Sequence, residues 1–291
     1  MKISIIFLYI VTILSWGSAF FFTNYQISTV SAEWSVSYRF FFTSIIFFFI
    51  SLLFGKKIFF PLKDHIIFFM LGVLLFSIHF IAVYHSIGII KSGLTAVGFS
   101  SILIMNVLLS KIILKNQFEI IVVIGSFFGI TGILLIFLPE FIDIDTSLLI
   151  IFGFLLAIAA ALIASLGNIL SEWYQKKGNS IVETSAWGMI YGCIISAIIG
   201  IVRGEKIIFE FSNEFMISLL YLVVFCTAIA FWAYLSLIKK IGSHKAAYAW
   251  VAAPLVALIL SYLFESYEWS ILSIIGSIFL IIGNILILKK W

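Results

Sequence analysis

The feature that most constrains the fold of this chain is a series of ten apolar segments, each about as long as a membrane is thick. The hydrocarbon core of a bilayer is about 30 Å deep, and an α-helix needs roughly 20 residues to cross it. Only Lys91-Ser92-Gly93 separates the third segment from the fourth. The sequence therefore predicts an all-α integral membrane protein with ten transmembrane helices, at residues 3–23, 35–54, 66–90, 92–110, 120–138, 148–170, 184–202, 215–238, 246–264 and 269–288.

Composition and link lengths support this interpretation. Hydrophobic residues make up 64% of the 291-residue chain and charged residues only 10%, far from the values of soluble domains. The longest polar link, residues 172–183, is too short to fold by itself, so we expect the activity to lie inside the membrane. Cys193 and Cys226 lie within apolar segments, which argues against a disulfide framework or a cysteine metal site. Lys2 and the apolar run after it resemble a signal peptide, but the even number of spans predicts a retained helix.

The small residues of one stretch recur 151 positions further along the chain (243 − 92 = 151). Matches of Gly, Ser and Ala carry the comparison, because matches of Ile and Leu are cheap in so apolar a chain. Five spans per half is an odd number, so the second half must enter the membrane from the opposite side. We predict two inverted five-helix repeats, at 1–140 and 147–291, in which Ser92, Ala96, Ser110, Gly125, Ser126, Phe128 and Gly132 correspond to Ser243, Ala247, Ser261, Gly276, Ser277, Phe279 and Gly283.

The distribution of basic residues predicts the orientation, because cytoplasmic loops carry an excess of Lys and Arg. With a cytoplasmic N-terminus, thirteen lysines fall on the inner side, three basic residues fall on the outer side, and Arg39 lies within a span. We therefore expect a multi-pass protein of the cytoplasmic (inner) membrane with both termini in the cytoplasm. Two inverted halves can rock against each other around a midplane cavity, so this layout favours transport by alternating access.

Three short motifs stand out in the chain: Trp16-Gly17-Ser18-Ala19-Phe20 in the first predicted helix, Tyr38-Arg39-Phe40 in the second, and Pro254, Glu268, Gly276 and Gly283 across the last two. They resemble the Trp-Gly signature of the first helix, the arginine of the second helix, and the proline, acidic residue and glycines of the last two helices in the drug/metabolite transporter superfamily, EamA type.

The chain also departs from the family pattern. In the first repeat Leu103 stands in place of the proline, and about Asn116 in place of the acidic residue. Ser165-Leu166-Gly167-Asn168 lacks the tryptophan often found in the sixth helix. The resemblance implies export of amino acids, amines and other small metabolites across the cytoplasmic membrane, or uptake of such solutes.

Arg39 is the sharpest candidate for solute binding. An arginine at the bilayer centre costs about 2.5 to 3.5 kcal/mol on insertion scales. Its side chain either reaches the outer headgroups or pairs with helix carbonyls, or it faces the cavity and attracts a carboxylate or phosphate of the solute. No Asp or Glu lies deep in any predicted span to neutralise it, which leaves room for an anionic group.

Two further candidates lie in the third segment. His79 is its fourteenth residue, about 20 Å from the inner end at helical rise. It is either a hydrogen-bonded core histidine or a cavity residue that binds solute or titrates during transport. His85 lies about 120° further round the helix and is expected to be structural. Tyr84 lies on another face and offers a hydroxyl group.

Aromatic residues inside spans supply the remaining candidates, namely Trp16, Tyr248 and Trp250. Helix packing alone can explain them, since belt aromatics collect at span ends instead. Pro254 frees a carbonyl in the preceding turn, so we expect the ninth helix to open near Trp250. Gly17 and Pro254 are expected to act as hinge or packing residues.

The sequence shows no phosphate-binding glycine loop, no His and acid cluster with metal spacing and no acyl-transfer motif. We therefore expect no catalytic residue, metal, cofactor or nucleic-acid partner, and the expected partners are a small-molecule solute and the lipid bilayer. The sequence does not distinguish a monomer from a homodimer.

The leading hypothesis is a secondary transporter of small polar metabolites, amino acids or related compounds, with export favoured by the resemblance. An alternative is an uptake or exchange carrier for an anionic or nucleotide-like metabolite, anchored by Arg39. A remote alternative is a multispan membrane enzyme. The lysine-rich inner loops do not provide the clustered His, Asp and Glu that such an enzyme needs.

Overall fold

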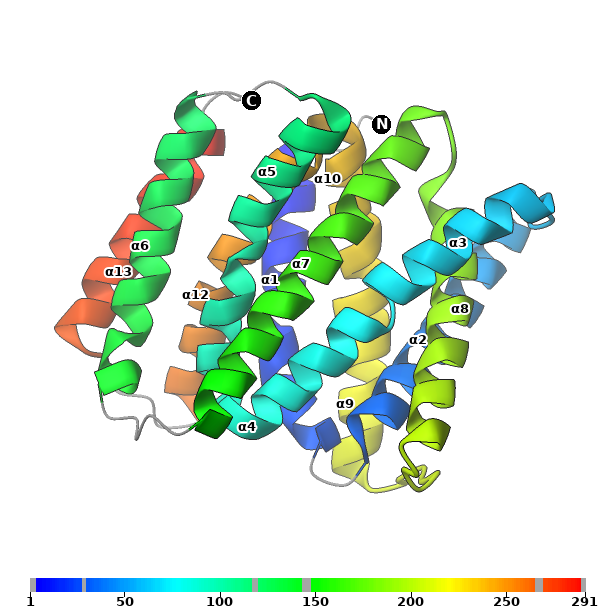
Figure 1. Cartoon of the computed structure of the whole chain (residues 1–291), viewed down its shortest axis with the longest axis horizontal. Helices are drawn as coiled ribbons and strands as arrows, with labels where there is room; N and C mark the ends of the chain where they lie inside the picture. The colour runs from blue at the N-terminus through cyan, green and yellow to red at the C-terminus, as the bar shows by residue number, and fades with distance from the viewer. Residues whose placement is uncertain (1–3, 28–29, 117–119, 143–147, 265–268, 289–291) are drawn as a thin grey trace.

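The computed structural model describes residues 4–27, 30–116, 120–142, 148–264 and 269–288. These residues form thirteen α-helices and one π-helical segment, η1 (Figure 1). The helices are α1 (Ile5–Ile27), α2 (Ala32–Leu53), α3 (Leu62–Leu75), α4 (Ile78–Ser100), α5 (Ile102–Leu114), α6 (Ile120–Ile142), α7 (Leu148–Lys176), α8 (Ile181–Val202), α9 (Asn213–Val223), η1 (Val224–Ile229), α10 (Ala230–Ile241), α11 (Ser243–Ala246), α12 (Tyr248–Phe264) and α13 (Ile271–Leu288).

The helices have the length and surface of membrane spans. Eight stretches are long and apolar enough to cross a bilayer, and two shorter apolar helices lie within α6 and α13. Large apolar side chains such as Phe49, Leu149 and Ile278 are at least half exposed on the outside of the bundle. In water such a surface would be unfavourable, whereas lipid solvates it. The predicted all-α membrane fold is confirmed.

The start of α1 and the end of α13 lie at the same end of the bundle (Figure 1). We call this end the terminal face and the other end the opposite face. Both helices run the length of the bundle, so an even number of crossings separates the two chain ends.

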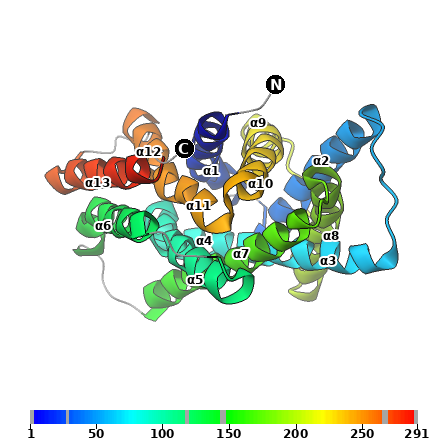
Figure 2. The ribbon, with the colours of Figure 1, turned by 90° about the horizontal axis from the view of Figure 1, so that it is seen from above.

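The two halves of the chain interlock. Helix α1 packs on α12, α2 on α8, α4 on α7 and α6 on α13, and each of these pairs joins one predicted repeat to the other. Figure 2 shows α6 and α13 side by side at one end of the molecule. The interior therefore lies at the junction of the two halves rather than within either one.

The third span is broken and the chain reverses after it. Helix α3 ends at Leu75 and α4 begins at Ile78, so the interruption falls at Phe76-Ser77. Within α4 the hydroxyls of Ser86 and Thr95 lie 2.9 Å apart, although nine residues of straight helix would separate them by about 13.5 Å. The chain must therefore turn back between them, where the sequence predicted a boundary at Lys91-Ser92-Gly93.

Glycines that mark the sequence repeat hold α6 against α13. A Cβ on Gly276 would lie 2.5 Å from the carbonyl oxygen of Gly132, and a Cβ on Gly132 would lie 2.6 Å from that of Gly276. Small residues let membrane helices approach this closely, and packing then supplies the attraction.

We expect Gly276→Ala to destabilise the protein, because the added methyl group must push two backbones apart. Overpacking of this kind costs about 1 to 3 kcal/mol. The measurement is the melting temperature of the purified protein in detergent, which should fall by several degrees. Gly88→Ala is the matched control, since a Cβ at Gly88 meets no atom within 4 Å. Equal melting temperatures for the two variants would contradict the contact.

Candidate functional site

A cavity of about 40 Å³ lies between α1, α2, α4 and α12. It has space for roughly three water molecules, so this form of the protein is nearly closed. The structure brings together Trp16, Arg39, His79, Tyr84 and Trp250, which the sequence analysis singled out separately. The remaining wall residues are Ala19, Thr23, Phe80, Val83, Ile87 and Phe99.

The cavity begins near the middle of the bundle and runs toward the opposite face. Trp16 is eleven residues after Ile5, the first residue of α1, which places it about 16 Å along a helix of roughly 34 Å. Ala19 and Thr23 follow on the same helix, one turn apart, and also line the cavity. Solute would therefore meet Trp16 at the inner end of the cavity and Thr23 nearer its mouth.

Arg39 is almost fully buried, with 2% of its surface exposed. Its Nε donates to the Oγ1 of Thr227 at 2.6 Å, and its Nη2 donates to the carbonyl of Cys226 at 3.1 Å. The guanidinium also lies 4.9 Å from the ring centre of Phe80. Among the described residues, no carboxylate pairs with it and its Nη1 makes no hydrogen bond.

The arginine is thus neither at the outer headgroups nor neutralised. Of the two interpretations that the sequence left open, snorkelling does not fit a side chain this buried. The guanidinium does bond to a helix carbonyl, but it also borders the cavity.

Stacked indoles form the inner wall of the cavity. The rings of Trp16 and Trp250 lie 3.8 Å apart with planes inclined by only 17°. Trp16 is fixed by a hydrogen bond from its Nε1 to the carbonyl of Cys226, and Tyr234 and Phe99 pack around the pair. Such a wall suits an apolar group of the solute.

His79 has a structural role as well as a place in the cavity wall. Its Nδ1 lies 2.8 Å from the carbonyl of Leu74, at the end of α3. Because a carbonyl only accepts, this nitrogen carries the proton. The hydrogen bond satisfies a backbone group beside the break at Phe76-Ser77, as a broken membrane helix requires.

Tyr84 is buried and lines the cavity, yet its hydroxyl has no hydrogen-bond partner among the described residues. An unpaired hydroxyl costs free energy inside a protein unless a ligand or water satisfies it. It is therefore available to the solute.

His85 faces away from the cavity, as expected. Its Nε2 lies 2.8 Å from Oε1 of Glu33, which is fully buried and also forms an ion pair with Nε of Arg203 at 3.2 Å. This cluster joins α2, α4 and the end of α8 near the opposite face. The sequence analysis missed Glu33, because α2 begins at Ala32, three residues before the predicted span.

Tyr248 does not line the cavity. Its hydroxyl instead lies 2.5 Å from the Oγ of Ser126 on α6. Nor does the ninth helix open near Trp250, since α12 runs without interruption through Pro254 from Tyr248 to Phe264. Pro254 removes only one backbone N–H donor, and packing against neighbouring helices keeps the rest of α12 helical.

Gly17 lies where α1 crosses α12 close to Pro254. A Cβ on Gly17 would lie 2.6 Å from the carbonyl oxygen of Ala253 and 2.4 Å from the Cβ of Val256. The glycine therefore allows the close approach that brings Trp16 onto Trp250. A hinge at Gly17 or Pro254 stays a prediction.

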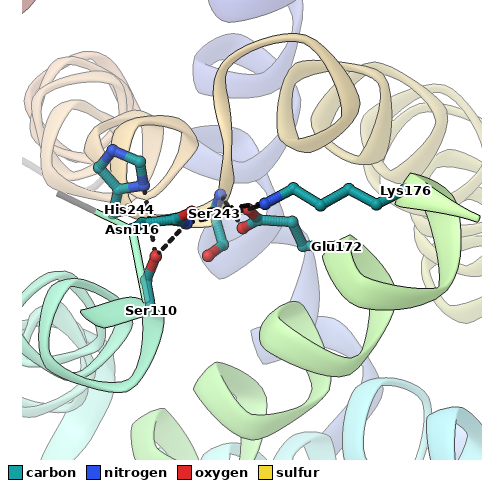
Figure 3. Close-up of polar contacts among 6 residues, drawn as sticks. All are labelled: Ser110, Asn116, Glu172, Lys176, Ser243 and His244. Carbon is teal, nitrogen blue, oxygen red and sulfur yellow. Dashed lines mark hydrogen bonds and ion pairs between the residues drawn. The ribbon is translucent and has the colours of Figure 1, made fainter. Parts of the chain in front are cut away.

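Toward the terminal face, a cluster of polar side chains links neighbouring helices (Figure 3). The carboxylate of Glu172 accepts from the backbone N–H of Ser243 at 2.6 Å, the Nδ2 of Asn116 at 3.1 Å and the Nζ of Lys176 at 2.8 Å. Asn116 also donates to the Oγ of Ser110 at 2.6 Å. We call Ser110, Asn116, Glu172 and Ser243 the terminal-face cluster.

The sequence analysis placed Glu172 at the start of a polar link, which is wrong. Helix α7 continues to Lys176, and Glu172 is 2% exposed. The predicted span ended at Leu170, because hydropathy falls after this residue. There the polar side chains at the end of α7 pair with neighbouring helices. On the side away from the bundle interior, the cluster borders an open pocket of about 420 Å³, which Lys239, Lys240 and His244 also line.

Between the cavity and this cluster lies a seam of buried polar groups. Asn168 donates to the hydroxyl of Tyr234 at 3.0 Å and approaches the Oδ1 of Asn106 at 3.4 Å. Asn168 and Glu172 are four residues apart and so share one face of α7. Polar groups therefore continue from the aromatic wall to the terminal face.

Two of the spans that lose regular helix correspond to each other in the repeat. Subtracting the repeat offset from η1, Val224–Ile229, gives residues 73–78, which contain the break at Phe76-Ser77. Interrupted helices at matching positions of two inverted halves mark the binding sites of many transporters. Here the carbonyl of Leu74, two residues before the break, holds His79, and the carbonyl of Cys226, within η1, holds Trp16 and Arg39.

The profile of the EamA-like transporter family matches residues 3–138 and 151–289, which together are nearly the whole chain. The chain belongs to this family. It is a multi-pass membrane transporter and not an enzyme. Two matched units agree with the internal repeat, whereas the boundaries at residues 140 and 147 stay a prediction.

Relatives of this EamA-like protein carry names that give no solute. Uncharacterized transporter YoaV of Bacillus subtilis (strain 168) is 24% identical over 222 residues, covering 76% of this chain and 75% of its own. An uncharacterized transporter of Buchnera aphidicola subsp. Schizaphis graminum (strain Sg) is 24% identical, covering 88% and 84%. Protein PagO of Salmonella typhimurium is 24% identical, covering 99% and 93%.

A solved crystal structure superposes on this chain with a TM-score of 0.80, covering 96% of this chain and 94% of the other. The two sequences are only 16% identical. The comparison therefore shows a shared fold and says nothing of the solute.

Proposed function

We propose that this EamA-like protein is a secondary transporter of small carboxylate-bearing metabolites, with apolar amino acids as the leading class. The observation that carries the proposal is Arg39, buried at the cavity wall with no carboxylate partner among the described residues. Export across the cytoplasmic membrane is the direction that the family resemblance favours.

Energetics favour an anionic group on the solute. A buried charge is costly unless it is paired, and Arg39 has only two neutral acceptors and two aromatic rings, Phe40 and Phe80, around it. The unbonded Nη1 and the second hydrogen of Nη2 form a fork that matches a carboxylate. The hydroxyl of Tyr84 can donate a further hydrogen bond to the same group.

The rest of the cavity favours an apolar solute body. Phe80, Val83, Ile87 and Phe99 line it together with the Trp16–Trp250 stack. No acidic side chain of the described residues lines it, so an ammonium group of an amino acid would lie against aromatic faces. The alternative of a nucleotide-like solute is less favoured, because a phosphate chain carries several negative charges and Arg39 is the only Lys or Arg among the described wall residues.

Alternating access fits the two ends of the path. The cavity runs toward the opposite face, and the terminal-face cluster closes the other side. Lys111, Lys176, Lys239 and Lys240 lie at the terminal face, which on the basis of lysine excess we propose to be cytoplasmic. This form would then be closed to the cytoplasm.

Counterflow in proteoliposomes tests the solute class. We expect purified protein to exchange labelled L-leucine, and 4-methylpentanoate, which has the carboxylate but no ammonium group, to compete. L-Leucinamide, which has the ammonium but no carboxylate, should compete at least about 10-fold more weakly, since one charge-assisted hydrogen bond contributes about 1.5 to 3 kcal/mol. Equal competition by the amide, or exchange of a nucleotide and of no carboxylate in a metabolite library, would overturn the proposal.

A further inference from the structure

The π-helical segment η1 does not line the cavity, but it bonds to two side chains that do, Trp16 and Arg39. The N–H of Ala230 bonds to the carbonyl of Phe225, five residues earlier, as in a π-helix. Neither Cys226 nor Thr227 of this segment is a wall residue. Single π-turns inside longer helices occur frequently at functional sites.

One turn of η1 fixes side chains from two other helices. The carbonyl of Cys226 accepts from Nε1 of Trp16 at 3.2 Å and from Nη2 of Arg39 at 3.1 Å. The Oγ1 of Thr227 accepts from Nε of Arg39 at 2.6 Å. All three hydrogen bonds are buried, so they tie α1 and α2 to the middle of the eighth span.

The hydroxyl of Thr227 is oriented to act as an acceptor. It donates its only proton to the carbonyl of Leu222 at 2.7 Å, also five residues earlier. Its lone pairs therefore remain for the Nε–H of Arg39. A regular α-helix would not offer these two acceptors, the Cys226 carbonyl and the Thr227 hydroxyl, side by side.

We propose that Thr227 is the positioning residue of the solute site, which it serves by holding Arg39 at Nε. This inference rests on the proposed role of Arg39 as the carboxylate anchor. Because the hydrogen bond to Thr227 holds Nε, the guanidinium plane cannot rotate. Its Nη1 and the free hydrogen of Nη2 therefore stay directed into the cavity. Without Thr227 the charge remains, but its planar fork loses its fixed direction, on which bidentate recognition depends.

The first test separates positioning from charge. In leucine counterflow, Thr227→Val should weaken competition by 4-methylpentanoate about 10-fold relative to competition by L-leucinamide, which lacks the carboxylate. Thr227→Ser keeps the hydroxyl and should restore the carboxylate preference. Equal weakening of both competitors, or no change in their ratio, would overturn the positioning role.

A second test needs no transported solute. The sequence holds only two arginines, Arg39 and Arg203, so mass spectrometry can follow the reaction of each with phenylglyoxal. We expect Arg39 to react at least about 3-fold faster in Thr227→Val, relative to Arg203 in the same sample. Thr227→Ser and Thr12→Val should react like the parent, since Thr12 bonds only to its own helix at Leu8.

A wild-type reaction rate of Arg39 in Thr227→Val would refute the proposal, and Thr227→Ala serves if the valine variant does not fold. The two proposals fail in different ways. If 4-methylpentanoate does not protect Arg39 of the parent protein from phenylglyoxal, the proposed solute class fails. The change of reaction rate on removing the Thr227 hydroxyl still decides whether this residue holds the guanidinium.

Discussion

Arg39→Gln is expected to reduce exchange of carboxylate-bearing solutes at least about 100-fold. The substitution removes two charge-assisted hydrogen bonds to the solute, each of which contributes about 1.5 to 3 kcal/mol, and every 1.4 kcal/mol is a factor of ten. The measurement is counterflow of labelled L-leucine in proteoliposomes. Glutamine can keep a bond to the Cys226 carbonyl, so the bundle should still fold.

Arg39→Lys is the matched control, because it keeps the charge and loses the fork. We expect it to retain intermediate activity, about 10-fold below the parent. Full activity of Arg39→Gln on carboxylated solutes would show that Arg39 serves packing alone. Circular dichroism and gel filtration of both variants establish that any loss is not a failure to fold.

Glu172→Gln should open the terminal face. The carboxylate accepts from three donors on three segments, and an amide offers one neutral acceptor in place of the charge. Charge-assisted hydrogen bonds are roughly twice as strong as neutral ones. The closed form should therefore lose a few kcal/mol, which shifts the equilibrium between closed and open forms by about 10- to 100-fold.

Cysteine accessibility measures this shift. In a protein with Cys193 and Cys226 replaced by serine, Ser165→Cys places a thiol at a buried position of α7 behind the cluster. A hydrophilic maleimide added at the terminal face should label it at least about 10-fold faster when Glu172→Gln is present. Lys176→Gln is the control, since its half-exposed side chain makes a weak pair, and it should change labelling by less than about 3-fold. Unchanged labelling in Glu172→Gln would remove the cluster from the closing mechanism.

The spans could be predicted from the sequence, whereas their irregularities could not. A segment such as 148–170 is apolar along most of its length, and lipid leaves it no alternative to a helix. The interruptions at Phe76-Ser77 and Val224–Ile229 contain neither proline nor glycine. At the first of them His79 bonds to the carbonyl of Leu74, five residues earlier, and at the second Arg39 bonds from another helix, and no local sequence pattern reveals either contact.

The site was predictable to the extent that polar groups inside spans need partners or a cavity. This argument selected Arg39 and His79, and the structure places both at the cavity wall. Tyr248, which the sequence also selected, does not line this cavity, because the face of a helix that is apolar all round cannot be read from its pattern. The sequence analysis missed Glu172, because burial at a span end depends on α7 reaching Ser243 of α11.

The pairing of helices across the two halves has a consequence for biogenesis. Helix α6 leaves the ribosome about 150 residues before α13, its main partner. At 5 to 20 residues per second that interval is on the order of 10 to 30 s. During it, Gly125 and Gly132 face lipid or the insertion machinery rather than their native neighbours. Until then the first half lacks its native partner helices and is open to quality-control proteases. The last helix to be synthesised supplies the missing contact.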